Sequence, residues 1–200
     1  MTAQYWDDRY ATIGGSAVSW FQESPDISLR LIGDVPRDAP IVDVGGGASG
    51  LVGALRRAGH SNLTVVDLSA EAINQGLERT VDPASINTLV SDVRDWQPSG
   101  QYQVWHDRAA YHFLTDPADQ QNYWSKVRAS VPVGGTVVIA TFAEDGPEMC
   151  SGLPITKYSP GDLTAAMGAG FTVVHSEREV HVTPTGGEQQ FIWLVAQRTT

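Results

Sequence analysis

The sequence contains one cysteine, Cys150, and this scarcity excludes an internal disulfide and any zinc site built from several cysteines. Basic residues are also few, because 13 Lys and Arg against 23 Asp and Glu give a formal net charge of −10. A chain with this charge is poorly suited to follow the phosphates of a nucleic acid or to bind an anionic membrane. We expect no nucleic-acid partner, no membrane partner and no bound metal.

Long apolar runs are missing as well. No stretch approaches the roughly 18 residues that a membrane span needs. The first ten residues, "MTAQYWDDRY", lack the basic segment and apolar core of a signal peptide. We therefore expect a cytoplasmic protein. Its 200 residues, 42% of them hydrophobic, suit a single domain that is a monomer or a homodimer.

Short β-branched segments alternate along the chain with segments of helical spacing. Strands are predicted at "PIVDV", "LTVVDL", "INTLV", "YQVWH" and "GGTVVIATFA". Asp116-Pro117 and Ser159-Pro160 each predict the start of a helix. Near the end, "FTVVHSEREV" and "QQFIWLVAQ" flank "TPTGG" and predict an antiparallel pair. The pattern indicates an α/β fold with a doubly wound, Rossmann-like sheet that binds ligands at the carboxyl ends of its strands.

The stretch "IVDVGGGASG" at residues 41–50 is predicted to be a turn from a strand into a helix. Gly45, Gly47 and Gly50 satisfy the G-x-G-x-x-G spacing of dinucleotide sites, and Asp67 ends the next strand, where it could bind ribose hydroxyls. Asp43, however, precedes Gly45 by two residues. Its carboxylate would repel a pyrophosphate and favour a cationic ligand such as an ammonium or a sulfonium. The charge therefore disfavours NAD.

Five segments, taken in order, resemble the motifs of the class I S-adenosylmethionine-dependent methyltransferases. They are "VDVGGGAS", "VVDLS", "VSDVRDW", "VWHDRAAYHFL" and "VPVGGTVVIATF", and the resemblance extends over roughly residues 35–145. It implies the seven-stranded sheet of that family and S-adenosylmethionine as the cofactor. One departure is Ser49, which stands where a third glycine is usual.

The resemblance also implies which residues bind the cofactor. Asp67 would hold the ribose, although it could be a plain strand-end carboxylate. Asp92 would lie near the adenine amino group, although it could instead cap the turn that follows it. The full predicted set is Trp6, Trp20, Asp43, Gly45, Gly47, Ser49, Asp67, Leu68, Asp92, Val93 and His106.

Within that family, the "D-R" pair of the fourth motif and the N-terminal "YWDDRY…SWFQ" resemble the thiopurine and small-thiol methyltransferase group. In that group an aromatic-rich helix folds over the cofactor. The chain accordingly divides into an N-terminal helical lid (1–34), a cofactor-binding core (35–145), and a substrate-side loop with the terminal β pair (146–200). All three parts belong to one domain.

This resemblance implies that Trp6, Arg9 and Trp20 close the site, whereas Asp107 and Arg108 face the substrate. Plain core packing is the alternative for the two tryptophans. A salt bridge with Arg108 is the alternative for Asp107.

A small thiol with a pKa near 8.5 is only a few per cent thiolate at pH 7. A neighbouring imidazole, His106 or His112, could take its proton, and Arg108 could favour the anion. The predicted catalytic residues are Asp107, Arg108, His106 and His112. The predicted substrate-binding residues are Arg108, Tyr111, Cys150 and His181, although Cys150 could be a small buried hydrophobic side chain.

The sequence therefore predicts a methyltransferase that S-methylates a small thiol, such as hydrogen sulfide or methanethiol. One alternative is a protein-lysine N-methyltransferase, since some of these share the "W-D-x-R-Y" start. Their fourth motif usually reads "D-K-G", however, and here it reads "D-R-A". Another alternative is a module that binds S-adenosylmethionine without turnover.

Overall fold

The computed structural model describes residues 2–200. The helices are α1 (Ala3–Ile13), α2 (Asp26–Ile32), α3 (Leu51–Arg57), α4 (Ala70–Glu78), α5 (Pro117–Ser130) and α6 (Pro160–Met167), with 3-10 turns η1 (Pro83–Ser85) and η2 (Tyr111–Phe113). The strands are β1 (Ile41–Val44), β2 (Leu63–Asp67), β3 (Asn87–Val90), β4 (Val104–Arg108), β5 (Thr136–Phe142), β6 (Met149–Cys150), β7 (Leu153–Pro154), β8 (Phe171–Val182) and β9 (Glu188–Arg198).

One seven-stranded sheet with the order β3-β2-β1-β4-β5-β9-β8 forms the centre of the fold. The first five strands in this order are parallel, while β9 is antiparallel to β5 and β8 is antiparallel to β9. The predicted doubly wound sheet with a late antiparallel pair is confirmed. Val44 lies opposite Val66 and Asp107, so β1, β2 and β4 end at the same edge.

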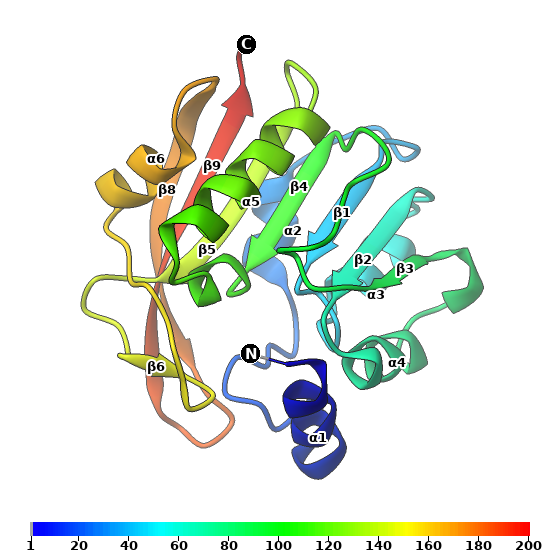
Figure 1. Cartoon of the computed structure of the whole chain (residues 1–200). Helices are drawn as coiled ribbons and strands as arrows, with labels where there is room; N and C mark the ends of the chain where they lie inside the picture. The colour runs from blue at the N-terminus through cyan, green and yellow to red at the C-terminus, as the bar shows by residue number, and fades with distance from the viewer. Residues whose placement is uncertain (1) are drawn as a thin grey trace.

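Helices cover both faces of the sheet, with α5 and α6 on one face and α2, α3 and α4 on the other (Figure 1). Successive strand residues contribute to two different cores because their side chains alternate between faces. Trp105 and Ile139 belong to the core beneath α5 and α6, whereas Val104 and Val138 belong to the core on the α2–α4 side. Burial on both faces explains why the middle of β5, residues 137–140, is apolar throughout.

Two predicted helix starts are confirmed in detail. Asp116 accepts a hydrogen bond from the Ala118 amide at 2.8 Å, and Pro117 occupies the first turn of α5. Ser159 and Asp162 form a reciprocal capping box at the start of α6.

The N-terminal helix α1 lies below the arrowheads of β1, β2 and β4 (Figure 1). Asp7 anchors it to the first turn of α4, where one carboxylate oxygen accepts the Ser69 hydroxyl at 2.6 Å and the Glu71 amide at 3.1 Å. Two features were not predicted as elements. Helix α2 lies within residues 1–34, and the β6–β7 hairpin lies within the loop after β5.

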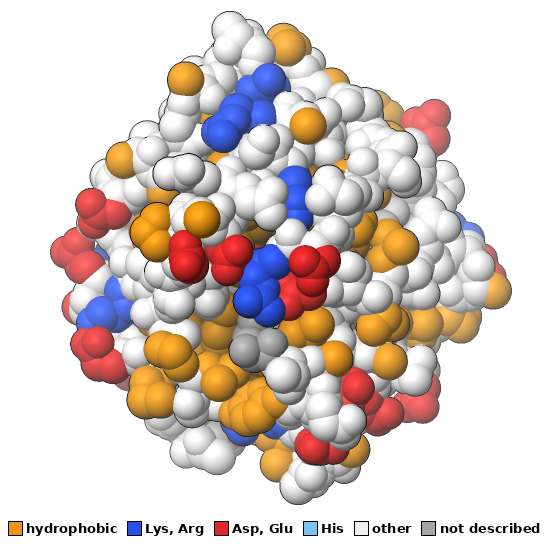
Figure 2. Space-filling model, in the orientation of Figure 1, with side chains coloured by type: hydrophobic (Ala, Val, Ile, Leu, Met, Phe, Trp, Pro, Cys, Tyr) orange, Lys and Arg blue, Asp and Glu red, His pale blue; other side chains and the backbone are white. Residues whose placement is uncertain are grey.

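Acidic side chains are scattered over the face seen in Figure 2, with basic side chains interspersed. None of the helices in residues 2–200 is both long and apolar enough to cross a bilayer. Over the same residues, no group of three or more His, Cys, Asp or Glu side chains lies close enough to hold a metal ion.

Candidate functional site

The glycine turn after β1 is shaped by close contacts that leave no space for side chains. Gly45 has a φ of +68°, and a Cβ placed there would lie 2.6 Å from the Cβ of Ala110. A Cβ on Gly47 would lie 2.6 Å from Oδ2 of Asp67. The backbone amide of Gly47 donates to that same oxygen at 3.0 Å, so the turn and the end of β2 are locked together.

Asp67 presents a carboxylate at the end of β2. Oδ1 accepts the Ser69 amide at 2.8 Å, and Oδ2 accepts the Gly47 amide. Burial raises the pKa of Asp67 to about 6, although these two amides act in the opposite direction. Each oxygen retains a free lone pair, because a carboxylate offers about four acceptor positions. Asp67 can therefore accept hydrogen bonds from a ligand.

A cavity of about 730 Å³, including its open mouth, follows the carboxyl edge of the sheet. We call it the main cavity. Its lining residues are Trp6, Tyr10, Trp20, Val44, Gly45, Val66, Asp67, Leu68, Ser91, Asp92, Val93, Arg108, Ala109, Ala110, Phe113, Leu114 and Cys150. Asp92 follows β3, Asp67 ends β2, Gly45 follows β1 and Arg108 ends β4, so the cavity spans four neighbouring strands.

The main cavity brings together most of the predicted cofactor residues. Those that line it are Trp6, Trp20, Gly45, Asp67, Leu68, Asp92 and Val93. Asp92 also caps the turn that follows it, since Oδ1 accepts the Arg94 amide at 2.9 Å and Oδ2 accepts Nη2 of Arg94 at 2.6 Å. Both interpretations of Asp92 are therefore compatible with its position.

Aromatic side chains from the N-terminal segment cover the main cavity. The rings of Trp6 and Trp20 meet edge to face at 5.7 Å, and Trp6 meets Phe113 at 5.4 Å. Tyr10 also lines the cavity and was not predicted. A signal for it exists in the sequence, because Tyr10 follows Trp6 by four residues and so lies on the same face of α1.

A second, smaller cavity lies on the other side of the glycine turn. Its lining includes Asp43, Ser49 and His106 of the predicted set, together with Ser28, which was not predicted. His106 connects Oδ1 of Asp43, 2.7 Å from Nδ1, to Oγ of Ser28, 2.9 Å from Nε2. Ser49 donates its hydroxyl to Oδ2 of Asp43 at 3.1 Å. The Asp43 carboxylate is thus held by two side chains beneath the turn.

Arg108 lines both cavities, and its side chain is only 10% exposed. Its Nη1 donates to the Trp20 carbonyl at 2.8 Å, and the guanidinium lies 4.7 Å from the ring centre of Phe191. Burial lowers the pKa of Arg108 to about 10, so the group stays charged at neutral pH.

Asp107 lies outside both cavities, which corrects the expectation that it faces the substrate. Its carboxylate accepts the Tyr123 hydroxyl at 2.7 Å and the amides of Ala110 and Tyr111 at 2.9 and 3.1 Å. It makes no salt bridge with Arg108 either. Burial raises the pKa of Asp107 to about 6. The side chain holds the loop after β4 against α5.

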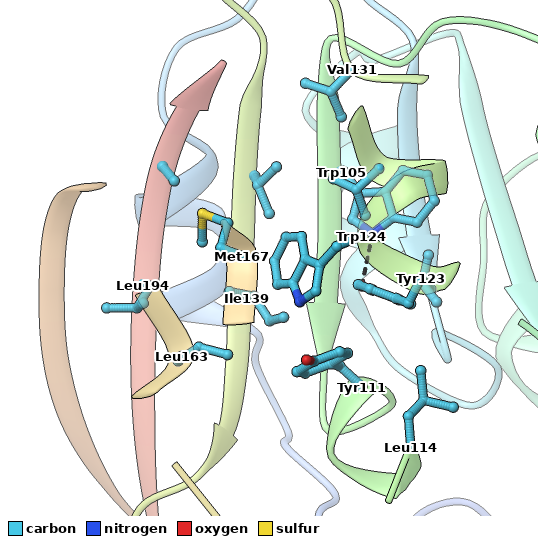
Figure 3. Packing of buried hydrophobic residues seen from close by; sticks show 14 of the residues in the cluster. Trp105, Tyr111, Leu114, Tyr123, Trp124, Val131, Ile139, Leu163, Met167 and Leu194 are labelled. Atoms are coloured by element: carbon cyan, nitrogen blue, oxygen red, sulfur yellow. Dashed lines mark hydrogen bonds between the residues drawn. The ribbon is translucent and has the colours of Figure 1, made fainter. Parts of the chain in front are cut away.

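Tyr111 and His112 are also placed differently from the prediction. Tyr111 is fully buried among Tyr123, Trp124 and Tyr158, in the core beneath α5 (Figure 3). His112 is fully buried, and burial followed by the charge of Arg108 lowers its pKa to about 3. Neither residue lines a cavity. Within the segment "AYHFL", Ala110, Phe113 and Leu114 line the main cavity, whereas Tyr111 and His112 pack in the core.

Of the remaining predicted substrate residues, Cys150 lines the main cavity and His181 does not. His181 lines neither cavity, because its Nε2 donates to the Ser19 carbonyl at 2.9 Å and holds the N-terminal segment. Cys150 does line the main cavity. It is 2% exposed, and burial raises the pKa of its thiol to about 12, so it stays protonated and is not a nucleophile.

Part of the chain is similar to known proteins. Residues 41–135 match a family described as a methyltransferase domain. A curated relative, malonyl-[acyl-carrier protein] O-methyltransferase 1 of Ilyobacter polytropus, is 24% identical over 88 residues. That alignment covers 44% of this chain and 32% of the relative, so the chain matches about a third of the relative's length.

Solved structures share the fold over nearly the whole chain. One comes from work on the conversion of a disulfide bond into a thioacetal group during echinomycin biosynthesis (TM-score 0.76, 16% identity, 99% of this chain and 93% of that one). Another is the 1,6-didemethyltoxoflavin-N1-methyltransferase of Burkholderia thailandensis with S-adenosylhomocysteine (0.71, 19%, 99% and 84%). A third is the N-methyltransferase NodS of Bradyrhizobium japonicum with S-adenosylhomocysteine (0.71, 14%, 97% and 100%).

Proposed function

We propose that this chain is a class I S-adenosylmethionine-dependent methyltransferase and that it methylates the sulfur of a small thiol. The fold and the domain match over residues 41–135 support the first part of this proposal. Hydrogen sulfide and methanethiol are the simplest members of this class. Their products would be methanethiol and dimethyl sulfide, with S-adenosylhomocysteine as the second product.

The residues of the main cavity fit the cofactor S-adenosylmethionine. Asp67 offers its free lone pairs to ribose hydroxyls, and the bare backbone of Gly45 allows close approach beside it. Asp92, Leu68 and Val93 continue the wall toward β3, where an adenine would be enclosed. When bound, the cofactor supplies a methyl group on a sulfonium, an electrophile that needs no further activation by the protein.

One observation carries the choice of a thiol. Among the described residues that line the main cavity, the side chains that can hold a charge near neutral pH are Asp67, Asp92 and Arg108. The two carboxylates lie at β2 and β3, whereas Arg108 lies at β4. On the main-cavity side, the wall near Arg108 therefore has a guanidinium, which is paired at 4.0 Å with Glu179 outside the lining, and no side-chain base. This arrangement favours an acceptor that ionises by itself.

A thiol meets that requirement, because its pKa near 8.5 leaves some thiolate at neutral pH. Arg108 increases that fraction, since a nearby positive charge favours the anion. Trp6, Trp20 and Phe113 exclude water from the thiolate and so reduce its solvation. A lysine amine, with a pKa near 10.4, would need a base to remove its proton, and a cation beside it would be unfavourable.

The neighbours' own substrates are diverse. Work on the first structure concerns sulfur chemistry, the conversion of a disulfide into a thioacetal, and this supports a sulfur acceptor. The other two structures are N-methyltransferases, and the curated relative is an O-methyltransferase.

The direct test supplies S-adenosylmethionine with thiols, amines, carboxylates and a lysine-bearing protein extract, and follows the release of S-adenosylhomocysteine. We expect turnover with thiols, with a rate that rises between pH 7 and 8.5 as the thiolate fraction grows. Methylation of protein lysine alone would refute the proposal. Cofactor binding without release of S-adenosylhomocysteine on any acceptor would favour a module that does not turn over.

A further inference from the structure

Two donors of the buried Arg108 side chain lack a partner. Nη1 is bonded to the Trp20 carbonyl, but Nε and Nη2 are both buried and make no hydrogen bond. Oε1 of Glu179 lies 4.0 Å from Nη2, so the two buried side chains form an ion pair without a hydrogen bond between them. A buried N–H donor without a hydrogen-bond partner is costly even where its charge is paired, so these two donors indicate a ligand that completes them.

Glu179 is held in place and does not satisfy the pair. Its Oε2 accepts a hydrogen bond from the indole N–H of Trp193 at 2.7 Å. Its Oε1 accepts one from Nε2 of the Gln22 side chain at 3.1 Å. Phe191 covers the guanidinium at 4.7 Å. Arg108 is therefore fixed by three neighbours, and its Nε–Nη2 edge remains unused.

The geometry of this edge selects a type of anion. Nε–H and one N–H of Nη2 point in the same direction and form a planar fork. The fork matches the two oxygens of a carboxylate, which it binds with two parallel hydrogen bonds. A single-atom anion such as hydrosulfide can occupy only one position and would leave the other donor unpaired.

We infer that the methyl acceptor carries a carboxylate that binds the Nε–Nη2 edge of Arg108, so that the preferred substrate is a small mercaptocarboxylate. The inference rests on the proposed thiol function and narrows it. Because Arg108 lines the main cavity beside the aromatic wall, a carboxylate bound there places the rest of a short molecule against Trp20 and Phe113. The carboxylate serves for binding, and the thiol sulfur receives the methyl group.

The test compares three acceptors of similar size: 3-mercaptopropionate, its uncharged amide 3-mercaptopropanamide, and 1-propanethiol. We expect kcat/KM for 3-mercaptopropionate to exceed that for the other two by about 10- to 150-fold, the usual value of hydrogen bonds to a charged group. In Arg108→Gln this preference should fall to less than about 3-fold. Arg178→Gln is the matched control, because Arg178 lies on β8, is half exposed, and pairs with Asp145. It should keep the preference of the unaltered protein.

Arg108→Lys separates charge from geometry, since lysine keeps the cation but lacks the fork. We expect most of the preference to be lost in this variant too. Circular dichroism establishes whether each variant is folded. Competition of butanoate with 3-mercaptopropionate in the unaltered protein gives a measurement that needs no variant, and we expect competitive inhibition by butanoate and none by butanamide.

S-adenosylmethionine has its own carboxylate, and calorimetry with S-adenosylhomocysteine tests whether Arg108 serves the cofactor. We expect Arg108→Gln to change this affinity by less than about 3-fold. A loss equal to that seen with the acceptor would overturn the inference. Equal rates with all three thiols would also overturn it and leave thiol methylation standing. Methyl ester formation from butanoate, with no thioether from any thiol, would refute thiol methylation itself.

Discussion

The two ends of the main cavity are built in different ways. At the cofactor end, contacts join residues that are close in the sequence, such as Gly47 with Asp67, 20 residues apart, and Asp67 with Ser69. At the Arg108 end, contacts join distant segments. Arg108 meets Trp20 across 88 residues, and Gln22 meets Glu179 across 157.

The shape of one end therefore follows from local sequence, and the shape of the other follows from tertiary packing. The cofactor end consists of a turn and a strand end whose shape follows from a few glycines and one aspartate. The Arg108 end requires the segment between α1 and α2 to be assembled together with β4, β8 and β9. The proposed function therefore predicts that substrate choice depends on packing between distant segments, and that cofactor binding depends mainly on local backbone shape.

The largest expected effect is at the cofactor end. Asp67→Ala should weaken the binding of S-adenosylhomocysteine by about 1.5–3 kcal/mol, because it removes the charged acceptor for the ribose. Calorimetry measures the change. Asp82→Ala is a suitable control, since Asp82 is an exposed partner of Arg56 at the surface. Tight binding of NAD with none of S-adenosylhomocysteine would contradict the cofactor assignment.

A second prediction concerns His112, which is buried against Phe113 and Phe142. Its pKa is about 3 in the folded protein and near 6.5 in the unfolded chain. The unfolded state therefore binds a proton first as the pH falls, and His112 should cost about 2 kcal/mol of stability between pH 7 and pH 5.

Asp67 and Asp107 act in the opposite direction, because their pKa values are raised to about 6 in the folded protein. The contribution of His112 is therefore obtained from the free energy of unfolding in urea, measured at both pH values. The change between pH 7 and pH 5 in the unaltered protein is compared with the change in His112→Gln. Parallel pH profiles for the two proteins would show that His112 is not buried in its neutral form.

A third prediction uses the pH dependence of cofactor binding. Asp67 takes a proton as the pH falls through about 6 and then loses part of its acceptor capacity. The affinity for S-adenosylhomocysteine should fall by about tenfold between pH 7.5 and pH 5. Asp67→Asn should bind more weakly at pH 7.5 but show a nearly flat profile. An unchanged slope in this variant would assign the titration to another group.

The smallest expected effect concerns the lid. Asp7 accepts hydrogen bonds at the start of α4, and Asp7→Ala should loosen α1 by about 1 kcal/mol. Proteolysis near Gly14 and Gly15, which follow α1 directly, should be faster in this variant and slower with S-adenosylhomocysteine bound. Asp8→Ala, at an exposed position of the same helix, provides the control. Equal cleavage with and without ligand would mean that α1 is a fixed part of the core.

The fold was predictable from the sequence because its signals are local. Short β-branched runs and the Asp116 and Ser159 caps define the strands and helices without reference to distant contacts. The glycine turn with Asp67 was also predictable, since its contacts lie within about one βαβ unit. The short β6–β7 hairpin was not, because two-residue strands leave no periodic pattern.

The Arg108 end was predictable only in part. The pattern "HDRAAYH" identifies ionisable residues but not the faces on which they lie. Arg108 lines the main cavity, whereas Asp107 and His112 are buried in the cores. The loop after β4 interrupts the regular alternation of side chains between the two faces of the sheet, so the sequence does not predict the direction of the side chains in this loop. Ser28 and Glu179 gave no local signal at all, because their partners are supplied by other elements.

The hydrogen-bonded chain from Asp43 through His106 to Ser28 has a spectroscopic consequence. A carboxylate can only accept, so Nδ1 of His106 carries the hydrogen and the imidazole is fixed in one tautomer. That hydrogen is shielded from solvent, since all three residues are no more than 3% exposed. It should give a slowly exchanging, strongly downfield proton resonance. Because Asp43 also lies beneath the glycine turn, this resonance would serve as a label-free reporter of ligand arrival at that turn.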